Sequence, residues 1–344
     1  KSDDLLLVVF SNLTPLSAVY SKTSTPAAHI IWNKKNNKNL CKILIVNSGN
    51  ANAHTGEEGV QRISTYSKVV ANYFNCKISE ILVSSTGVIG EQLDIKKIIN
   101  NFPLSHNIKN QEMLNAAKSI MTTDTYPKTS LKTIKIASKE IRIFGFAKGS
   151  GMIFPNMGTM LAYVFVEANI SKKNLKTILK SNLNHSFNSI SVDGDTSTND
   201  TLMLFSLSDK KQNQINKPNK IQLISSAIRE VMHDLSMQVV CDGEGISKLM
   251  QVNIMNAKTY SQASNIAFAI ANSQLVKTAI AGEDANWGRI IMAIGKTNEK
   301  INQNKIKLSF GKLKVAINGK MHTKINIKKL NEYMKEKKIE INVD

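Results

Sequence analysis

Strand-like and helix-like segments alternate along this chain, and that alternation limits the folds open to it more than any other feature. Short apolar runs such as residues 5–10, 42–46 and 161–166 end in polar or glycine-rich turns, which is typical of buried strands. Because both kinds of segment occur before and after Thr159, the sequence predicts a layered α/β protein and not a helical bundle or a barrel. We expect further strands from 81 and over 202–207, a β-hairpin over 130–147 and a strand after 248. We expect helices over 57–74, from 94, and over 110–121, 172–186, 221–238 and 261–276, with a solvated insertion at 210–220.

Size and composition place the chain among ordinary globular proteins. Its 344 residues are enough for one large domain or two closely packed ones. The longest apolar runs fall short of the ~18 residues that a membrane-spanning helix needs, and no signal-peptide pattern is visible. Cys41, Cys76 and Cys241 are far apart, and neither they nor the histidines have the spacing of a metal site. We therefore expect a cytoplasmic protein with no disulfide framework, no metal and no membrane contact.

The net charge of +19 has two interpretations. A strongly basic chain can bind nucleic acid. However, the lysines are dispersed and not clustered with aromatic residues, and arginine, which reads bases most often, is scarce. The heavy use of Lys, Asn and Ile throughout is what drift in base composition produces. We therefore expect no nucleic-acid partner.

The loop from Lys148 to Thr159 carries the strongest chemical signal. Gly158 and Thr159 end a segment rich in Gly, Pro and Asn, directly before an apolar run. A threonine whose amide is cut on its N-terminal side gains an α-amine beside its own hydroxyl, so one residue supplies both base and nucleophile. Glycine before it suits such a cut, because a residue without Cβ can adopt a strained backbone. A Gly-Thr pair by itself, however, is usually only a turn.

Other loops offer weaker candidates. Thr86 and Gly87 follow a predicted strand and could present a hydroxyl and N–H groups to an oxyanion, although a plain turn is the commoner meaning. Glu244 lies between two glycines, where it is either a turn residue or a partner for a substrate amine. The aspartates within 193–200 lack the glycine and distal glutamate of a calcium loop, so we expect hydrogen-bonded turn structure there. The glycine loops also lack the dinucleotide and P-loop patterns.

Taken together, eight segments resemble one family, the ornithine acetyltransferases (glutamate N-acetyltransferases) of arginine biosynthesis. They occur in the family's order and cover nearly the whole chain. The segments are residues 47–53, 84–90, 121–125, 147–153, 156–161, 191–201, 242–245 and 281–289. The motifs at 156–161 and 191–201 are the most specific.

The resemblance implies an N-terminal-nucleophile-like sandwich of sheets and helices in two closely packed lobes. It implies self-cleavage between Gly158 and Thr159 into an α chain, 1–158, and a β chain, 159–344, which assemble as an (αβ)2 heterotetramer. Thr159 would then take acetyl from N-acetylornithine and pass it to glutamate in a ping-pong cycle. No cofactor is implied, although some family members accept acetyl-CoA as acetyl donor.

The resemblance also assigns roles to single residues. Those matching the family's oxyanion hole are Thr86 and Gly87. Those matching its substrate-binding residues are Thr122, Lys148, Thr159 and Glu244. Lys148 is suited to pair with a substrate carboxylate, whereas the group that Glu244 faces stays open. The assignment of Thr122 is the loosest, because Thr123 and Thr125 lie beside it.

Two features depart from the family's pattern. Gly158 stands where the family usually has alanine, which preserves small size, so cleavage is still expected. The sequence ends at Asp344, where family members continue into a segment that also contacts substrate, and we expect this to weaken acetyl transfer. Two alternatives therefore remain: an aminopeptidase that uses the same kind of nucleophile, with water as acceptor, and an inactive truncated paralogue.

Overall fold

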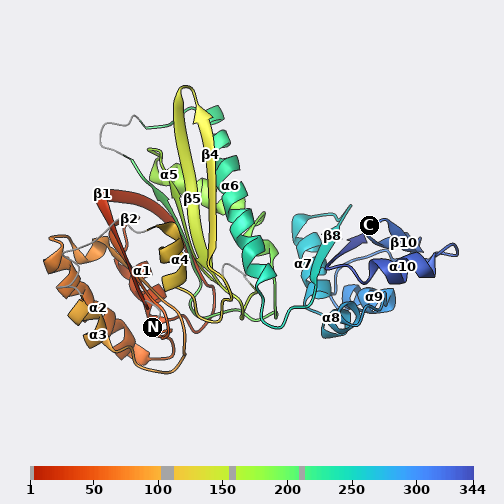
Figure 1. Cartoon of the computed structure of the whole chain (residues 1–344). Helices are drawn as coiled ribbons and strands as arrows, with labels where there is room; N and C mark the ends of the chain where they lie inside the picture. The colour runs from red at the N-terminus through yellow and green to blue at the C-terminus, as the bar shows by residue number, and fades with distance from the viewer. Residues whose placement is uncertain (1–3, 102–111, 155–159, 209–213) are drawn as a thin grey trace. The chain divides into compact units, whose positions relative to one another are not determined.

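The computed structural model describes residues 4–101, 112–154, 160–208 and 214–344. The chain divides into two compact units, Lys1–Glu244 and Gly245–Asp344, each with its own sheet (Figure 1). Helices and strands alternate in both units, so the predicted α/β class is confirmed.

The first unit is built on a seven-stranded sheet with the order β3-β2-β1-β7-β6-β5-β4. Its strands are β1 (Leu5–Tyr20), β2 (Leu40–Asn47), β3 (Ile81–Ser85), β4 (Lys128–Ile136), β5 (Lys139–Lys148), β6 (Leu161–Val166) and β7 (Thr201–Ser206). The pairs β2–β3 and β6–β7 are parallel, and the other neighbours are antiparallel. The expected hairpin is confirmed as β4 and β5.

The strand β1 is much longer than the predicted run over 5–10. Its first part, Leu5–Val9, pairs with β2, and its last part, Leu16–Tyr20, pairs with β7, with a register shift between Val9 and Thr14. The polar residues in between hide this continuity in the sequence, because a bulge interrupts the alternation of side chains. One strand therefore joins two halves of the sheet.

The side chains of β2 show that these halves face each other. Ile43 and Ile45 pack against the helices α1 to α3, whereas Leu44 and Val46 pack against aromatic residues of β5, β6 and β7. Alternate residues of a strand point to opposite faces, so the second half-sheet covers the inner face of β2. The helices in question are α1 (Ala28–Asn36), α2 (Gly56–Tyr73) and α3 (Ile95–Asn101).

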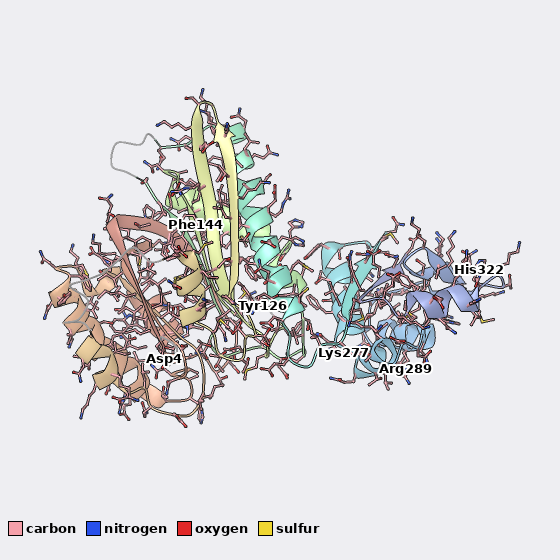
Figure 2. The ribbon with its side chains drawn as sticks, in the orientation of Figure 1. Asp4, Tyr126, Phe144, Lys277, Arg289 and His322 are labelled. Carbon is pink, nitrogen blue, oxygen red and sulfur yellow. The ribbon has the colours of Figure 1, made fainter. Side chains whose placement is uncertain are left out.

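The strand β6 has the same two-sided environment. Tyr163 and Phe165 point into the inner core, where Phe165 stacks on Phe144 of β5 with ring centroids 5.2 Å apart (Phe144 is labelled in Figure 2). Val164 points to the outer face, which α5 (Lys172–Leu183) and α6 (Pro218–Cys241) cover. Figure 1 shows α6 running along β4 and β5. The order of layers is thus helices, half-sheet, half-sheet, helices, which confirms the expected sandwich; α4 (Met113–Ser119) also contributes to the inner core.

The second unit has a five-stranded sheet with the order β11-β10-β9-β12-β8. Its elements are β8 (Leu249–Ile254), α7 (Tyr260–Ala271), α8 (Gln274–Ala281), α9 (Trp287–Gly295), β9 (Leu308–Phe310), β10 (Leu313–Ile317), β11 (Lys320–Met321), α10 (Ile327–Tyr333) and β12 (Lys338–Val343). Short 3-10 turns occur in the chain at Ile78–Glu80, Phe187–Ser189 and Gln303–Lys305. Trp287 packs against this unit's core. Arg289, labelled in Figure 2, donates to the carbonyl of Leu275 at 2.8 Å and to the hydroxyl of Thr278 at 3.0 Å.

Two helix predictions need correction. The segment 261–276 is not one helix, because α7 ends at Ala271 and the hydroxyl of Ser273 caps a new helix by accepting from the Val276 N–H. The helix α6 begins at Pro218, inside the predicted insertion, since proline suits the first turn of a helix. Within the described ranges, no helix is long and apolar enough to cross a membrane.

The expected α and β chains do not coincide with the compact units. The expected cut lies between β5 and β6, which pair through Ala147–Ala162 and Lys148–Leu161 in the first unit's sheet. Gly158 and Thr159 themselves lie outside the described residues, so the cut stays a prediction. If it occurs, both chains contribute strands to one sheet.

A buried imidazole should make the first unit sensitive to acid. His29 is fully buried, and its Nε2 lies 3.1 Å from both the Asn199 carbonyl and the Thr201 hydroxyl. Burial lowers the pKa of His29 from 6.5 to about 3, against the opposing effect of its bond to Asn199. Between these two values the unfolded chain binds a proton that the native chain does not, so its stability falls as the pH is lowered.

Replacing His29 by Gln should reduce the slope of the unfolding free energy against pH by about 1.4 kcal/mol per pH unit, which is the effect of one proton. Urea unfolding measured from pH 6.5 downward tests this, with the exposed His185→Gln as the matched control. An identical pH slope for wild type and His29→Gln would contradict the prediction.

Candidate active site

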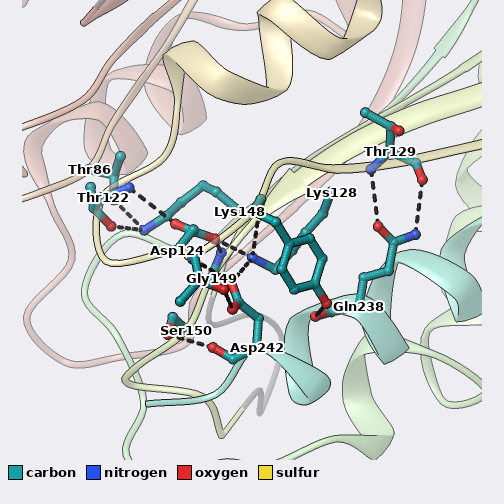
Figure 3. A network of polar contacts seen from close by, with 12 residues as sticks. Thr86, Thr122, Asp124, Lys128, Thr129, Lys148, Gly149, Ser150, Gln238 and Asp242 are labelled. Atoms are coloured by element: carbon teal, nitrogen blue, oxygen red, sulfur yellow. Dashed lines mark hydrogen bonds and ion pairs between the residues drawn. The ribbon is translucent and has the colours of Figure 1, made fainter. Parts of the chain in front are cut away.

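The ends of β3 and β5 come together although four strands separate them in the sheet order. Lys148, the last residue of β5, donates from Nζ to the hydroxyl of Thr86 at 3.1 Å and to the hydroxyl of Thr122 at 2.7 Å (Figure 3). Thr86 directly follows β3, so each half-sheet supplies one side of this contact. Three of the predicted site residues therefore meet at one ammonium group.

The surroundings of Lys148 lower the pKa of its ammonium on balance. Removal from water lowers the pKa of its ammonium, and the nearby Lys128 cation lowers it further. The carboxylates of Asp124, Glu244 and Asp200 act in the opposite direction without cancelling these effects. An anionic ligand beside Lys148 would therefore stabilise the charged form of its side chain.

The structure distinguishes the three neighbouring threonines by their contacts. The hydroxyl of Thr122 accepts from Lys148, whereas Thr125 donates both its N–H, at 2.9 Å, and its hydroxyl to the carboxylate of Asp242. Thr122 and Thr123 are both exposed, and Thr122 accepts the hydrogen bond from Lys148 at 2.7 Å. Of the choices that the sequence left open, Thr122 is the one that lies at Lys148.

The backbone at position 87 leaves no room for any side chain, so glycine is required there. Its φ is +130°, and a Cβ there would lie 2.2 Å from the carbonyl carbon of Gly49 and 2.5 Å from the nitrogen of Asn50. The flanking amides fix this approach, since Thr86 N–H donates to the Asn47 carbonyl at 3.0 Å and Val88 N–H to the Gly49 carbonyl at 3.2 Å. The matched segment 47–53 therefore holds the backbone at Thr86 and Gly87, the two residues predicted to form the oxyanion hole.

The hydroxyl of Thr86 has a defined role in this arrangement. Because an ammonium has only donors, the contact with Lys148 uses a lone pair of the Thr86 oxygen. This contact leaves the hydroxyl hydrogen available to a different acceptor. Thr86 is 7% exposed, so a ligand oxygen reaching it would meet a largely desolvated donor.

Glu244 is exposed and lies beside the loop that follows Lys148. Its carboxyl group sits over Gly151, where an added Cβ would come within 2.9 Å of the Glu244 carboxyl carbon. Its N–H donates to the Ser150 carbonyl at 3.2 Å. The predicted site therefore has a cation and a carboxylate on adjacent segments.

A buried ion cluster behind these residues was not recognised in the sequence. The ammonium of Lys128 is paired with Asp124 at 2.7 Å and with Asp242 at 2.5 Å (Figure 3). Burial by itself would raise the pKa of Asp124, but Lys148, Lys128 and the Gly149 N–H hold it below its usual value. The only sequence signal was indirect, because Asp124 and Asp242 lie inside matched motifs.

The segment before the expected cut is held by Asp193. Its carboxylate accepts from the N–H of Met152 at 2.5 Å and of Ile153 at 2.9 Å. The Asp195 N–H also donates to the Asp193 carboxylate at 3.0 Å, so the aspartate loop makes a hydrogen-bonded turn as its sequence predicts. Among the described residues, no group of three or more His, Cys, Asp or Glu side chains is arranged to hold a metal ion.

Comparisons with known proteins agree with the motifs. The model of the family described as "ArgJ family" matches residues 1–344. The arginine biosynthesis bifunctional protein ArgJ of Bartonella henselae is 41% identical over 345 residues, covering 99% of this chain and 84% of the relative. The protein of the same name from Bradyrhizobium diazoefficiens is also 41% identical, over 347 residues, with the same coverage.

Among solved structures, the arginine biosynthesis bifunctional protein argJ of Bacillus halodurans is 33% identical, with a TM-score of 0.48, covering 53% of this chain and 85% of its own. The ornithine acetyltransferase of Mycobacterium tuberculosis, complexed with ornithine, is 26% identical, with a TM-score of 0.37, covering 46% and 84%. The resemblance predicted from the sequence is confirmed by the match over the whole chain and by the identity to the two curated relatives. The chain belongs to the ArgJ family.

Proposed function

We propose that this chain is an acetyltransferase of arginine biosynthesis that moves acetyl from N-acetylornithine to glutamate. The names of its curated relatives place them in arginine biosynthesis. The observation that carries the proposal is the convergence of Thr86 and Thr122 on the Lys148 ammonium. With Glu244 on the neighbouring segment, this site offers both charges that an amino acid needs from a binding site.

Substrate binding follows from those charges. The Lys148 ammonium pairs with the α-carboxylate that N-acetylornithine and glutamate share, and the Thr122 hydroxyl completes this contact. Glu244 faces the side-chain ammonium of ornithine. A carboxylate replacing water at Lys148 also removes the penalty of holding that cation in a partly dehydrated position.

The proposed chemistry uses Thr159 twice. Its hydroxyl first attacks the carbonyl carbon of Gly158, and the C–N bond to Thr159 breaks, so the acyl group moves to Oγ as an ester and the α-amine of Thr159 is freed. Water then hydrolyses the ester, which leaves Gly158 with a free carboxylate and restores the Thr159 hydroxyl. That amine then accepts the hydroxyl proton while Oγ attacks the acetyl carbonyl of N-acetylornithine. Ornithine leaves with the proton, and the amine of glutamate takes the acetyl from the threonine ester.

Charge develops on the carbonyl oxygen in each of these steps. The Thr86 hydroxyl, polarised by Lys148, and the backbone N–H of Gly87 are the proposed donors to it. Preorganised donors of this kind are effective because they need no reorientation during the reaction.

The shared sheet supports the pairing of one α chain with one β chain in the proposed (αβ)2 assembly. Cutting before Thr159 would leave β1 to β5 in one chain and β6 and β7 in the other, joined by the β5–β6 and β1–β7 ladders. We also propose that the protein works in the cytoplasm, needs no cofactor and can use acetyl-CoA as a second acetyl donor to glutamate.

Acetyl transfer is tested with N-acetylornithine carrying a labelled acetyl group. We expect label in N-acetylglutamate, parallel-line ping-pong kinetics, and a peptide beginning at Thr159 that is one acetyl group heavier before glutamate is added. Acetyl-CoA with glutamate tests the second donor in the same assay. Release of labelled acetate at the same rate with and without glutamate would instead identify an aminopeptidase-like hydrolase, and no labelled product would indicate an inactive relative.

A further inference from the structure

A buried ion cluster lies behind the proposed substrate-binding residues, and the mechanism above does not use it. Lys128, the first residue of β4, is 0% exposed, and its Nζ donates to Asp124 at 2.7 Å and to Asp242 at 2.5 Å. A third, longer contact of 3.4 Å reaches the carbonyl of Tyr126. Buried ion pairs contribute little net stability, because desolvation offsets the attraction. The cluster therefore calls for another explanation.

One arm of the cluster leads to Lys148. The carboxylate of Asp124 accepts from the Gly149 N–H at 2.6 Å and from the Thr122 N–H at 3.1 Å. Gly149 follows Lys148 in the chain, and Thr122 is the acceptor of the Lys148 ammonium. The position of Asp124 therefore fixes both sides of the Lys148–Thr122 contact.

The other arm leads to Glu244. The carboxylate of Asp242 is held by Lys128 and by Thr125, and its backbone carbonyl accepts from the Ser150 hydroxyl at 2.7 Å. The Glu244 N–H then donates to the Ser150 carbonyl at 3.2 Å. Through these two hydrogen bonds, Asp242 helps to position the segment that carries Glu244.

We propose that Lys128 is a positioning residue that bridges Asp124 and Asp242. It thereby holds Lys148 and Glu244 at positions from which both can bind one substrate. The inference rests on the proposed function, in which these two residues grip opposite charges of the same amino acid. Without the central cation, two buried carboxylates would lie close together unpaired and would repel each other. This repulsion would displace the backbone on which the two substrate-binding side chains depend.

If Lys128 has this role, its charge affects the pKa of Lys148, whereas a side chain that only fills space would not. The charged groups facing Lys148 are Asp124, Lys128, Glu244 and Asp200. Lys128 lowers the pKa of Lys148, while the three carboxylates raise it. Removing the charge of Lys128 should therefore raise the pKa of Lys148.

The test compares Lys128→Met with Lys132→Met. Lys132 lies on the same strand, and its ammonium makes an exposed ion pair with Glu230 at 2.7 Å, a kind of contact that contributes little. In the full chain, the pH midpoint for chemical labelling of the Lys148 amine, followed by mass spectrometry, should rise in Lys128→Met, because one of the two causes that lower its pKa is removed. It should not change in Lys132→Met, and an unchanged midpoint in Lys128→Met would overturn the inference.

Kinetics provide the second readout. The KM for N-acetylornithine should rise by about tenfold or more in Lys128→Met, with a smaller fall in kcat, because binding geometry is disturbed more than the nucleophile. Wild-type chain that transfers no acetyl would refute the proposed function, whereas the labelling midpoint would still decide the role of Lys128.

If thermal melting shows that Lys128→Met does not fold, Asp242→Asn carries the test. This variant keeps the size of the side chain and the Lys128–Asp124 pair but weakens the bridge. The same rise in KM is expected. A KM within about twofold of the wild-type value would overturn the inference.

Discussion

Replacing Thr159 by alanine should leave a single uncut chain of 38.0 kDa and abolish acetyl transfer. Without the hydroxyl, nothing attacks the carbonyl of Gly158, so the α-amine that would serve as base is never freed. Wild-type protein should instead give two bands on a denaturing gel, from chains 1–158 and 159–344. Mass spectrometry of both bands locates the cut to a single bond.

The serine variant is the matched control for this experiment. Thr159→Ser keeps a hydroxyl at the same position, so it should still be cut and still transfer acetyl, at a reduced rate. Two bands of unchanged size from Thr159→Ala would show that another protease makes the cut. Uncut wild-type protein with full activity would remove the free α-amine from the mechanism.

The sequence predicted the fold class well because the strands that matter are buried on both sides. Residues 161–166 form a continuous apolar run since the helices α5 and α6 cover one face of β6 and the opposite half-sheet covers the other. Such runs are visible without a structure. The length of β1 was not, because the polar residues at its bulge break the pattern.

The site could be predicted only as a list of residues. Motifs named Thr86, Thr122, Lys148 and Glu244, but nothing in the sequence says that the end of β3 reaches the end of β5. That contact depends on the folding of the sheet over itself at β1, which is a tertiary property.

The role of Lys128 was hidden for a related reason. A lysine in a chain with 45 lysines and arginines attracts no notice, and its two partners are 118 residues apart in numbering, from Asp124 to Asp242. Complete burial is what sets it apart, and burial of a single charged side chain has no local sequence signature.

The second large effect is expected from Thr86. Thr86→Ala should lower kcat by about 10²- to 10³-fold, the usual loss when one donor to an oxyanion is removed, while KM for N-acetylornithine changes little. Self-cleavage should slow as well, because the Gly158 carbonyl oxygen develops the same negative charge. Steady-state kinetics and the time course of band formation measure the two effects on one preparation.

Thr86→Ser separates the hydroxyl from the methyl group of the same side chain. Serine keeps the oxygen that accepts from Lys148 and the hydrogen that this contact leaves available, so kcat should return to near the wild-type value. If Thr86→Ala instead raised KM at constant kcat, Thr86 would act in substrate binding and not in stabilising the oxyanion. If alanine and serine lowered kcat equally, the methyl group and its packing beside Gly87 would be what the reaction requires, and the hydroxyl would have no part in it.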